Sequence, residues 1–412
     1  MKDILSHRYN SNPDKVFIYY RNKKYTYCRF SKIVEYIYHF ILNKNFDKYV
    51  NIDINNKVNL FAAIIACNRA GKIPIMITDR DRSDIVFSRG ATIKKDIDEK
   101  KDNRFSYDED STQVVVFSSG TSGDPKGIEL SFNSFYKNSE MWNDAFRFDS
   151  GDIYCNILSL KHVGGLCIMF RALYNNFSVI IDDYSNIDKC KLRYDYISLV
   201  PAMLYDIVNK NEIDSFLNIK KIFIGGSSFN SNVLKKAIDK KLPLYAVYGM
   251  TETCSGIACA EINNLNYNNL IYKSFKDVNI TVDNDKISIQ SPSLMNKYLY
   301  SNKLIDKFLS NDLGILCEDG FKVLGRSDKV IVSGGENFDS KLIKDAINCF
   351  PGVLDAKISF IDDEKWINKI VAYIKTDDCA LRKQDIINFL DGLIPRNMIP
   401  KEISFVKKFD DT

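Results

Sequence analysis

Helix-like and strand-like segments alternate along much of this chain, and that alternation most constrains its fold. Apolar residues recur at helical spacing over 29–43 and again over 58–70, where the pattern ends at Gly71. The apolar run at 73–77 then predicts a buried strand, and a strand–helix–strand order returns over 221–247. Such alternation is typical of parallel sheets covered by helices. The sequence therefore predicts an α/β fold for the large N-terminal region.

The pattern changes after about residue 271. Short apolar segments such as VNITV, KISIQ and FKVLG are separated by turn residues, which predicts antiparallel strands and a small β-barrel. After Arg326 the patterns are mixed again: KLIKDAINCF has helical spacing, whereas DAKISFI and KIVAYIK are strand candidates. We therefore expect a large N-terminal domain over 1–326, followed by a small, mobile α+β domain over 327–412.

Charge and cysteine content exclude several classes of protein. The 57 basic and 53 acidic side chains give a net charge of only +4, which does not indicate binding to nucleic acid or to an anionic membrane. Ten cysteines occur without a Cys-x-x-Cys pair, and with only three histidines they do not indicate a zinc site. The first residues lack the apolar run of a signal peptide, and LFAAIIAC at 60–67 is too short to span a bilayer. We expect a cytoplasmic protein with reduced thiols.

The strongest local signal is QVVVFSSGTSGDPKG at 113–127. A buried strand pattern runs directly into a loop of glycines and small hydroxyl side chains that is followed by Lys126. Glycine lets backbone N–H groups approach an anion closely and the lysine adds positive charge, so the loop can form a polyphosphate cradle. It is not a Walker A loop, because Lys126 follows Pro125 where that pattern requires glycine. Taken alone, the segment is equally compatible with an ordinary flexible Ser/Gly loop.

Several segments in order resemble the adenylate-forming superfamily of acyl-CoA synthetases, luciferases and peptide-synthetase adenylation domains. SSGTSGDPKG resembles its signature loop, and KKYTYCRF and FAAIIACNRAGKIPI resemble its two N-terminal motifs. YGMTET at 248–253 is similar to its adenine and magnesium motif, NDLG at 311–314 to its ribose motif, and GRSDKVIVSGGEN at 325–337 to its hinge and thiol-tunnel motif. IGGSS, YGMTET and SGGEN look most similar to the o-succinylbenzoate–CoA ligase branch.

The resemblance implies ATP and Mg²⁺ as cofactors. Thr121 and its neighbours would hold the phosphates, Thr251 would add a hydroxyl donor, and Glu252 would bind Mg²⁺, since a hard cation that bridges phosphates prefers carboxylate oxygen. Tyr248 would stack on adenine, although a buried core tyrosine is an open alternative, and Asp312 would accept hydrogen bonds from the ribose. The residues expected to contact the nucleotide are Ser118, Ser119, Gly120, Thr121, Ser122, Gly123, Lys126, Gly225, Gly226, Tyr248, Gly249, Asp312 and Arg326.

The same resemblance implies how the acid and the thiol would bind. His162 in LSLKHVGG matches a gate residue beside the acyl pocket, and a structural role for it is an equal alternative. The segment KHVGGLC lacks an aspartate for a substrate amine, which favours a small carboxylic acid without an α-amine. Asp328 matches the hinge of the small domain, and Gly334 and Gly335 match the strip that admits a pantetheine arm.

The resemblance therefore predicts an acid–thiol ligase that forms an acyl-adenylate and passes the acyl group to CoA. The first alternative is an enzyme that loads the phosphopantetheine of an acyl or peptidyl carrier protein. The family also places an adenylation lysine in a C-terminal Gly-Lys turn, whereas IPKEISFVKKFDDT reaches Thr412 before that turn, and Lys407 and Lys408 come too early to match it. A catalytically impaired adenylate-binding homologue is therefore the second alternative.

Overall fold

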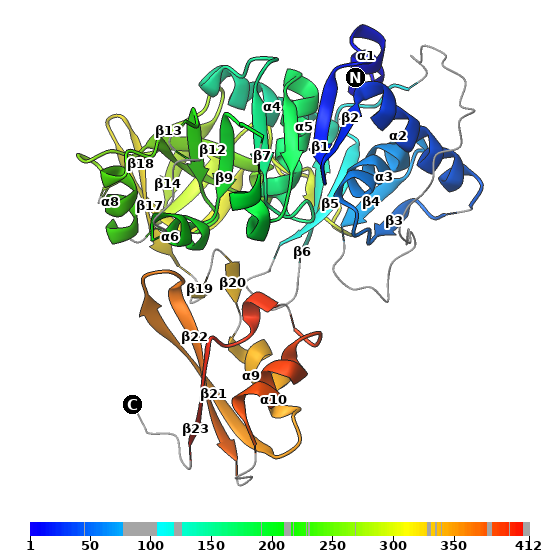
Figure 1. Ribbon diagram of the computed structural model, residues 1–412. Coiled ribbons are helices and arrows are strands. Elements are labelled where there is room, and N and C mark those ends of the chain that lie inside the picture. Colours follow the sequence, from blue (N-terminus) through cyan, green and yellow to red (C-terminus); the bar gives the residue numbers. More distant parts are fainter. Residues whose placement is uncertain are drawn as a thin grey trace.

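The N-terminal part of the computed structural model is organised around two mixed β-sheets that share one hydrophobic core (Figure 1). Strands and helices alternate around this core, as the apolar patterns predict. The structure describes residues 1–44, 46–76, 105–118, 126–190, 192–209, 216, 218–227, 229, 231–267, 269–327, 331–333, 336–338, 340–376, 381–394 and 396–406.

The larger sheet has nine strands in the order β13-β12-β11-β10-β9-β7-β8-β1-β2. Its interior strands, from β1 to β11, pair in parallel, and both edges are antiparallel. β12 runs antiparallel to β11 because the four residues between them are too few for a parallel crossover. The strands are β1 (Val16–Tyr20), β2 (Lys23–Thr26), β7 (Ile153–Asn156), β8 (Ser178–Ile181), β9 (Tyr196–Leu199), β10 (Lys221–Ile224), β11 (Leu244–Met250), β12 (Ser255–Glu261) and β13 (Lys273–Ser274).

The second mixed sheet has five strands in the order β16-β6-β5-β4-β3, and its β3, β4 and β5 are parallel. β5 and β6 form an antiparallel pair in which Ser118 lies opposite Lys126, so both ends of the glycine-rich loop are held by one hairpin. The strands are β3 (Tyr49–Ile52), β4 (Ile73–Met76), β5 (Thr112–Ser118), β6 (Lys126–Ser131) and β16 (Lys297–Tyr298).

Helices cover these sheets, and their ends follow local sequence signals. Asn56 caps α3 by accepting hydrogen bonds from the backbone N–H groups of Val58 and Asn59. Gly71 adopts a φ of 69° just beyond α3, which is the left-handed helix stop that the sequence predicts. The elements are α1 (Ile4–Ser11), α2 (Tyr27–Leu42), α3 (Lys57–Arg69), α4 (Phe132–Phe146), α5 (Val163–Asn175), η2 (Tyr184–Lys189), α6 (Pro201–Val208), α8 (Ser231–Asp239) and η3 (Thr251–Thr253).

The short strands expected after residue 271 form a four-stranded antiparallel sheet in the order β14-β15-β17-β18. It lies beside the nine-stranded sheet at the edge that carries β12 and β13 (Figure 1). Its strands are β14 (Asn279–Asp283), β15 (Lys286–Gln290), β17 (Phe308–Cys317) and β18 (Gly320–Arg326).

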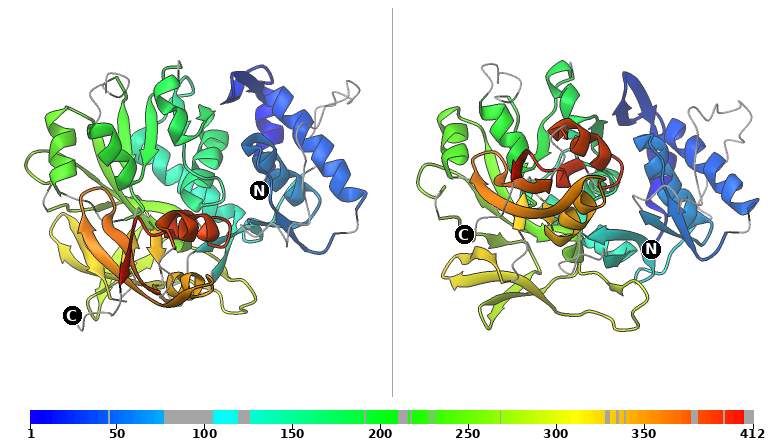
Figure 2. Two further views of the ribbon diagram at one scale, coloured as in Figure 1. Left: turned by 60° about the horizontal axis from the view of Figure 1, so that its bottom comes forward. Right: turned by 90° about the horizontal axis from the view of Figure 1, so that it is seen from below.

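The C-terminal part forms a separate body, which lies below the sheets in Figure 1 and in front of them in Figure 2. A three-stranded sheet, β21-β22-β23, packs helices α9 and α10 around its own hydrophobic cluster, which includes Ile343, Ile370 and Leu390. The elements are β19 (Ile331–Ser333), β20 (Glu336–Phe338), α9 (Ser340–Asn348), β21 (Val353–Asp363), β22 (Ile367–Thr376), α10 (Lys383–Leu390), η4 (Arg396–Met398) and β23 (Glu402–Val406).

The predicted α/β architecture with a smaller α+β part at the C-terminus is confirmed. Among the helices that the structure describes, none is long and apolar enough to cross a membrane.

Candidate active site

A cavity of about 1370 Å³ lies where the parallel strands of the nine-stranded sheet end. Its walls come from the carboxyl ends of β9, β10 and β11, from η3, from β17 and β18, and from Asn368 on β22. Ligands of open α/β sheets bind at the carboxyl ends of the strands, because loops there can converge on a common point. The position of the cavity therefore makes it the candidate active site.

Every predicted site residue that the structure describes lines this cavity. Segments nearly 210 residues apart in the sequence contribute to it, which the sequence alone could not demonstrate. The predicted residues in its wall are Ser118, Lys126, His162, Gly225, Gly226, Tyr248, Gly249, Thr251, Glu252, Asp312 and Arg326. The predictions for Ser119, Gly120, Thr121, Ser122, Gly123, Asp328, Gly334 and Gly335 lie outside the described residues.

Tyr248, Asp312 and Arg326 form one connected group. The Tyr248 hydroxyl donates to Asp312 Oδ2 at 2.8 Å, and Arg326 Nη1 lies 3.6 Å from Asp312 Oδ1. Asp312 and Arg326 are cross-strand partners on β17 and β18, so the sheet register sets this pair. Burial, with the Asp312 charge second, raises the pKa of Tyr248 well above its usual range, so the phenol stays protonated as a donor.

The ring of Tyr248 is packed edge-on against Phe321, with ring centroids 5.4 Å apart, and only 8% of the residue is exposed. Tyr248 is thus both a core tyrosine and a lining residue of the cavity. Stacking on adenine, which the motif predicts, remains a prediction.

Glu252 projects from η3, the short 3-10 turn between β11 and β12. Its backbone carbonyl accepts from Met295 N–H at 2.8 Å, and Ser293 Oγ donates to the carbonyl of Thr253 at 3.0 Å, so the turn is fixed on both sides. Removal from water raises the pKa of the Glu252 carboxyl, an effect that Lys126 and Arg326 partly offset. Within the described part of the chain, no ion pair forms with Glu252, and a desolvated carboxylate of this kind suits a hard divalent cation.

Tyr298 is a neighbour of Glu252 that the motifs did not indicate. Burial, followed by the charge of Glu252 and a hydrogen bond to it, raises the pKa of Tyr298 to about 12. Lys126 Nζ lies 5.7 Å from the centroid of the same ring. Tyr298 is on the short strand β16, and its pairing with β6, opposite Ile128, holds it beside the site.

Gly249 is required by the close approach of β12. A Cβ at this position would lie 2.2 Å from the carbonyl oxygen of Ser255 and 2.6 Å from the Cα of Gly256. Both are backbone atoms that cannot swing away, so a larger residue would push β11 and β12 apart beside η3.

His162 occupies the N-cap position of α5, with extended φ and ψ of −107° and 147°. Its carbonyl accepts from Leu166 N–H, and its side chain is exposed at the cavity wall. The next residue toward the N-terminus, Lys161, pairs with Asp53 at the end of β3, which ties the two mixed sheets together here. The gate role of His162 remains a prediction.

The inner end of the cavity contains a buried arginine that sequence reasoning missed. Arg171 on α5 is 1% exposed, and its guanidinium carbon lies 3.6 Å from the centroid of the Trp142 ring. Its Nε and Nη2 donate to Asn138 Oδ1 at 3.1 and 2.9 Å, and Nη2 also donates to Ser255 Oγ at 3.1 Å. Burial lowers the pKa of Arg171, though an arginine stays charged.

All of these partners of Arg171 are neutral. Across the described residues, no carboxylate pairs with Arg171, whose hydrogen bonds from Nε and Nη2 go to Asn138 and Ser255. A charge buried without a counter-ion is costly. This end of the cavity is therefore suited to an anion.

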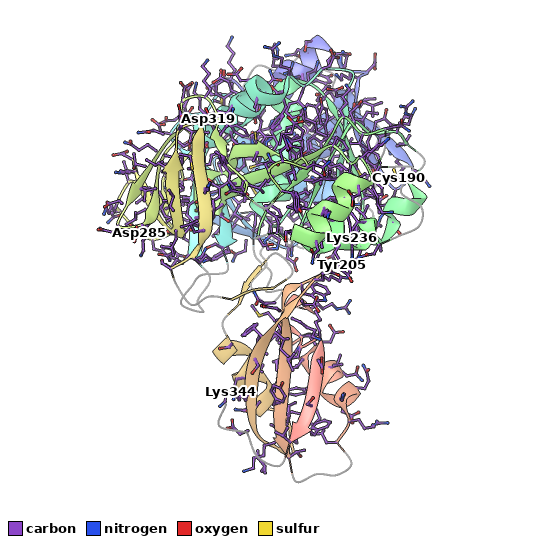
Figure 3. All side chains as sticks on the ribbon, turned by 90° about the vertical axis from the view of Figure 1, so that its left-hand side faces the viewer. Cys190, Tyr205, Lys236, Asp285, Asp319 and Lys344 are labelled. Atoms are coloured by element: carbon purple, nitrogen blue, oxygen red, sulfur yellow. The ribbon has the colours of Figure 1, made fainter. Side chains whose placement is uncertain are left out.

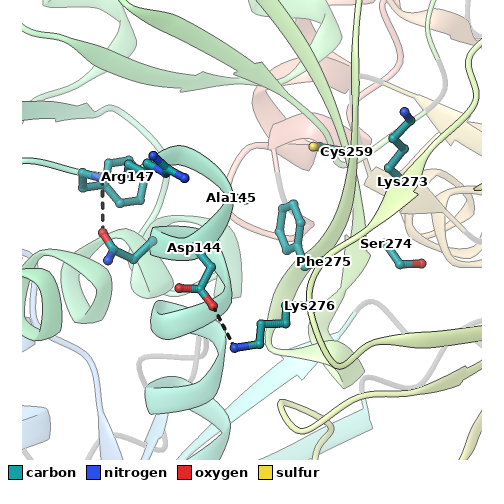
Figure 4. Close-up of a pocket in the computed structure, with 10 residues that line it drawn as sticks. Asp144, Ala145, Arg147, Cys259, Lys273, Ser274, Phe275 and Lys276 are labelled. Atoms are coloured by element: carbon teal, nitrogen blue, oxygen red, sulfur yellow. Dashed lines mark hydrogen bonds and ion pairs between the residues drawn. The ribbon is translucent and has the colours of Figure 1, made fainter.

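A second pocket of about 740 Å³ lies between the end of α4 and β12–β13 (Figure 4). Lys276 there pairs with Asp144 at 3.7 Å, and Phe148 N–H donates to Asn143 Oδ1 at 3.2 Å. None of the predicted site residues lines it. It is a separate surface hollow, and it adds no group to the candidate active site.

Curated proteins similar to this chain include 2-succinylbenzoate–CoA ligases. The chain is 25% identical over 327 residues to a 2-succinylbenzoate–CoA ligase of Staphylococcus epidermidis, which covers 75% of this chain and 69% of that protein. It is 26% identical over 319 residues to the Staphylococcus aureus enzyme of the same name, which covers 73% and 64%. The matched region thus spans roughly two thirds of the length of these relatives.

Solved structures share the fold over the whole chain. A double mutant of the o-succinylbenzoate CoA synthetase of Bacillus subtilis, bound to a product analogue, is 20% identical, with a TM-score of 0.82 and coverage of 100% of this chain and 96% of that one. The same enzyme in complex with ATP and magnesium is 19% identical, with a TM-score of 0.68 and coverage of 100% and 97%. The AMP-binding enzyme family matches residues 79–299, more than half of the sequence, and the chain belongs to the AMP-binding enzyme family.

Proposed function

We propose that this protein is an acid–thiol ligase that uses ATP, Mg²⁺ and CoA. A carboxylate oxygen of the acid attacks the α-phosphorus of ATP, and the bond to pyrophosphate breaks. The CoA sulfur then attacks the acyl carbonyl, AMP leaves, and the thiol proton passes to solvent. Most of the rate enhancement would come from positioning and charge stabilisation.

The residues around Asp312 support the nucleotide part of this proposal. The Asp312 carboxylate is held by Tyr248 on one oxygen and by Arg326 on the other, so it is oriented before a ligand arrives. It would accept hydrogen bonds from ribose hydroxyls, while Arg326 would face the ribose or the phosphates. Glu252 is the carboxylate that fits Mg²⁺, and the bound ion would neutralise charge on the phosphates.

The buried Arg171 supports a more specific acid. The curated relatives act, by name, on 2-succinylbenzoate, a compound that carries a second carboxylate besides the one to be activated. Arg171 lines the cavity and has only neutral partners among the described residues, so an anionic group on the acyl part would neutralise it. We therefore propose 2-succinylbenzoate, or an acid with the same two carboxylates, as the substrate.

Pyrophosphate–ATP exchange over a panel of acids tests both parts. The panel contains 2-succinylbenzoate, the matched acid without the ring carboxylate, and unrelated aliphatic and aromatic acids. We expect label in ATP with some acid, the highest rate with 2-succinylbenzoate, and release of AMP when CoA is added. No exchange with any acid, while ATP still binds, would leave an adenylate-binding protein without catalysis; thioester formation on a carrier protein but not on CoA would favour the carrier-loading alternative.

Two further assignments stand as proposals. The division into 1–326 and 327–412, with a hinge at Asp328 and a thiol path at Gly334 and Gly335, is supported by the separate hydrophobic cluster of the C-terminal part. A cytoplasmic location is supported by cysteines that are free wherever the structure describes them, four of them buried.

A further inference from the structure

The hairpin between β21 and β22 contacts the large domain through its tip. Lys365 Nζ lies 2.6 Å from Asp206 Oδ1 on α6, and Glu364 Oε2 lies 3.5 Å from Lys236 Nζ on α8. Figure 3 shows Tyr205 of α6 and Lys236 of α8 at the edge of the large domain that faces the small one. Two neighbouring residues of the hairpin therefore pair with two neighbouring helices.

Hydrogen bonds within the hairpin itself hold its tip in a turn. Asp363 Oδ1 accepts from the backbone N–H groups of Lys365 and Trp366, each at 2.9 Å, which fixes the turn. The Trp366 ring has Lys365 Nζ 4.9 Å and Lys401 Nζ 5.0 Å from its centroid. Lys401 lies just before β23, and burial, with the Lys365 charge second, lowers its pKa, so two cations from different segments meet at one ring. Of the two cations, Lys365 pairs with Asp206 on α6.

The order of the charges defines one docked position. The large domain presents Asp206 on α6 and Lys236 on α8. The hairpin presents Lys365 to the first and Glu364 to the second. A shift that exchanged the two contacts would bring Lys365 toward Lys236 and Glu364 toward Asp206. Like charges at contact distance are unfavourable, so the pattern selects this arrangement over its neighbours.

The same elements form the wall of the candidate active site. Met203 of α6 and Leu234 of α8 line the cavity, and so does Asn368, which follows the hairpin tip on β22. When the tip docks on α6 and α8, β22 of the same hairpin therefore also approaches the cavity.

We propose that the Lys365–Asp206 and Glu364–Lys236 pairs form an electrostatic latch that holds the small domain against α6 and α8, and that must open when the small domain changes position between the two half-reactions. The second part rests on the proposed function. Partly exposed ion pairs are individually weak, which suits a contact that forms and breaks in every catalytic cycle.

Charge reversal with a compensating swap tests the latch in the full chain. The variants are Lys365→Glu, Asp206→Lys and their combination, together with the parallel set Glu364→Lys, Lys236→Glu and their combination. Amide hydrogen exchange of α6, α8 and the hairpin tip reports docking without any need for activity. We expect each single variant to speed exchange in these segments by about fivefold, and each combination to restore it.

Lys344→Glu is the matched control, because Lys344 pairs with Asp355 at 2.9 Å entirely within the small domain (Figure 3). Faster exchange of α6 in this control, unchanged exchange in the single variants, or no recovery in the combinations would overturn the latch. The second readout is the ratio of acyl-adenylate formation to thioester formation from a pre-made acyl-adenylate. We expect this ratio of the two half-reactions to shift in the same direction in all four single variants. A chain without ligase activity would refute the proposed function, whereas the exchange result would still decide the latch.

Discussion

The two ends of the large cavity are built on different principles. At the end proposed to hold the nucleotide, Asp312 is paired with Arg326 and accepts a hydrogen bond from Tyr248, so its charge is balanced without a ligand. At the inner end, Arg171 is buried among Trp142, Asn138 and Ser255 and has no carboxylate among the described residues. In the proposed function, the first end would hold the nucleotide, which every reaction of the family shares. The second end leaves the Arg171 charge without a counter-ion among the described residues. An anionic group on a particular acid would neutralise this charge, so specificity for the acid would reside there.

The largest expected effect tests the nucleotide end. Glu252→Gln removes the carboxylate charge that fits Mg²⁺ and should lower the exchange rate by about 10²–10³-fold with every acid that reacts. The measurement is pyrophosphate exchange at limiting and saturating Mg²⁺. Glu261→Gln, an exposed change on β12, is the control. An unchanged rate at limiting Mg²⁺ would mean that another group holds the metal.

The next effect tests the inner end and should depend on the acid. Arg171→Met removes the buried charge and should lower kcat/KM by about 10- to 100-fold for 2-succinylbenzoate, because a charge-assisted hydrogen bond is lost. The matched acid without the second carboxylate should lose far less. Arg147→Met, at the exposed end of α4, is the control, and Tm tracks folding. Equal losses for both acids would show that Arg171 is only structural.

A smaller effect probes the pair at the ribose position. Asp312→Asn keeps an acceptor for the Tyr248 hydroxyl but removes the charge, and should weaken ATP binding about tenfold in the absence of any acid. Calorimetric titration with ATP measures it, with Asp319→Asn on the exposed β17–β18 turn as the control. If affinity for ATP holds while only the acid KM rises, Asp312 belongs to the acyl side and the comparison between the two ends fails.

The smallest effect concerns Tyr298 and is seen only at alkaline pH. Its pKa is about 12 in the folded chain against an ordinary value of 10.0, so the folded state holds its proton longer. Stability from this group is complete below pH 10 and is lost as the pH rises toward 12. As the pH rises, the free energy of unfolding of Tyr298→Phe should fall by about 1 kcal/mol less than that of the parent chain. This figure is reduced because solvent screens a partly exposed group. Denaturant unfolding at pH 9 and 11 measures it, and Tyr300→Phe, on an exposed tyrosine, should change nothing. Equal alkaline loss in Tyr298→Phe and the parent chain would contradict the assignment.

The elements could be predicted, and so could the motif residues that line the cavity, because their signals are local. The helix over α3 and its stop at Gly71 depend on side chains within one or two turns. YGMTET runs from the end of β11 into η3, and NDLG lies within β17, so each motif is a short local segment of the chain. Where the structure describes the predicted residues, they meet in one cavity.

The amino-acid sequence by itself determined the α/β architecture, the order of the elements and the motif residues, because apolar periodicity and turn chemistry act over short distances. Only the tertiary structure decided which side chains meet across elements. Arg171 and Trp142 come from α5 and α4, and Tyr298 reaches Glu252 through β16, in segments that carry no motif. The Lys365–Asp206 contact joins residues 159 positions apart. Such pairs depend on packing and sheet register, which arise only after the hydrophobic core has brought distant segments together.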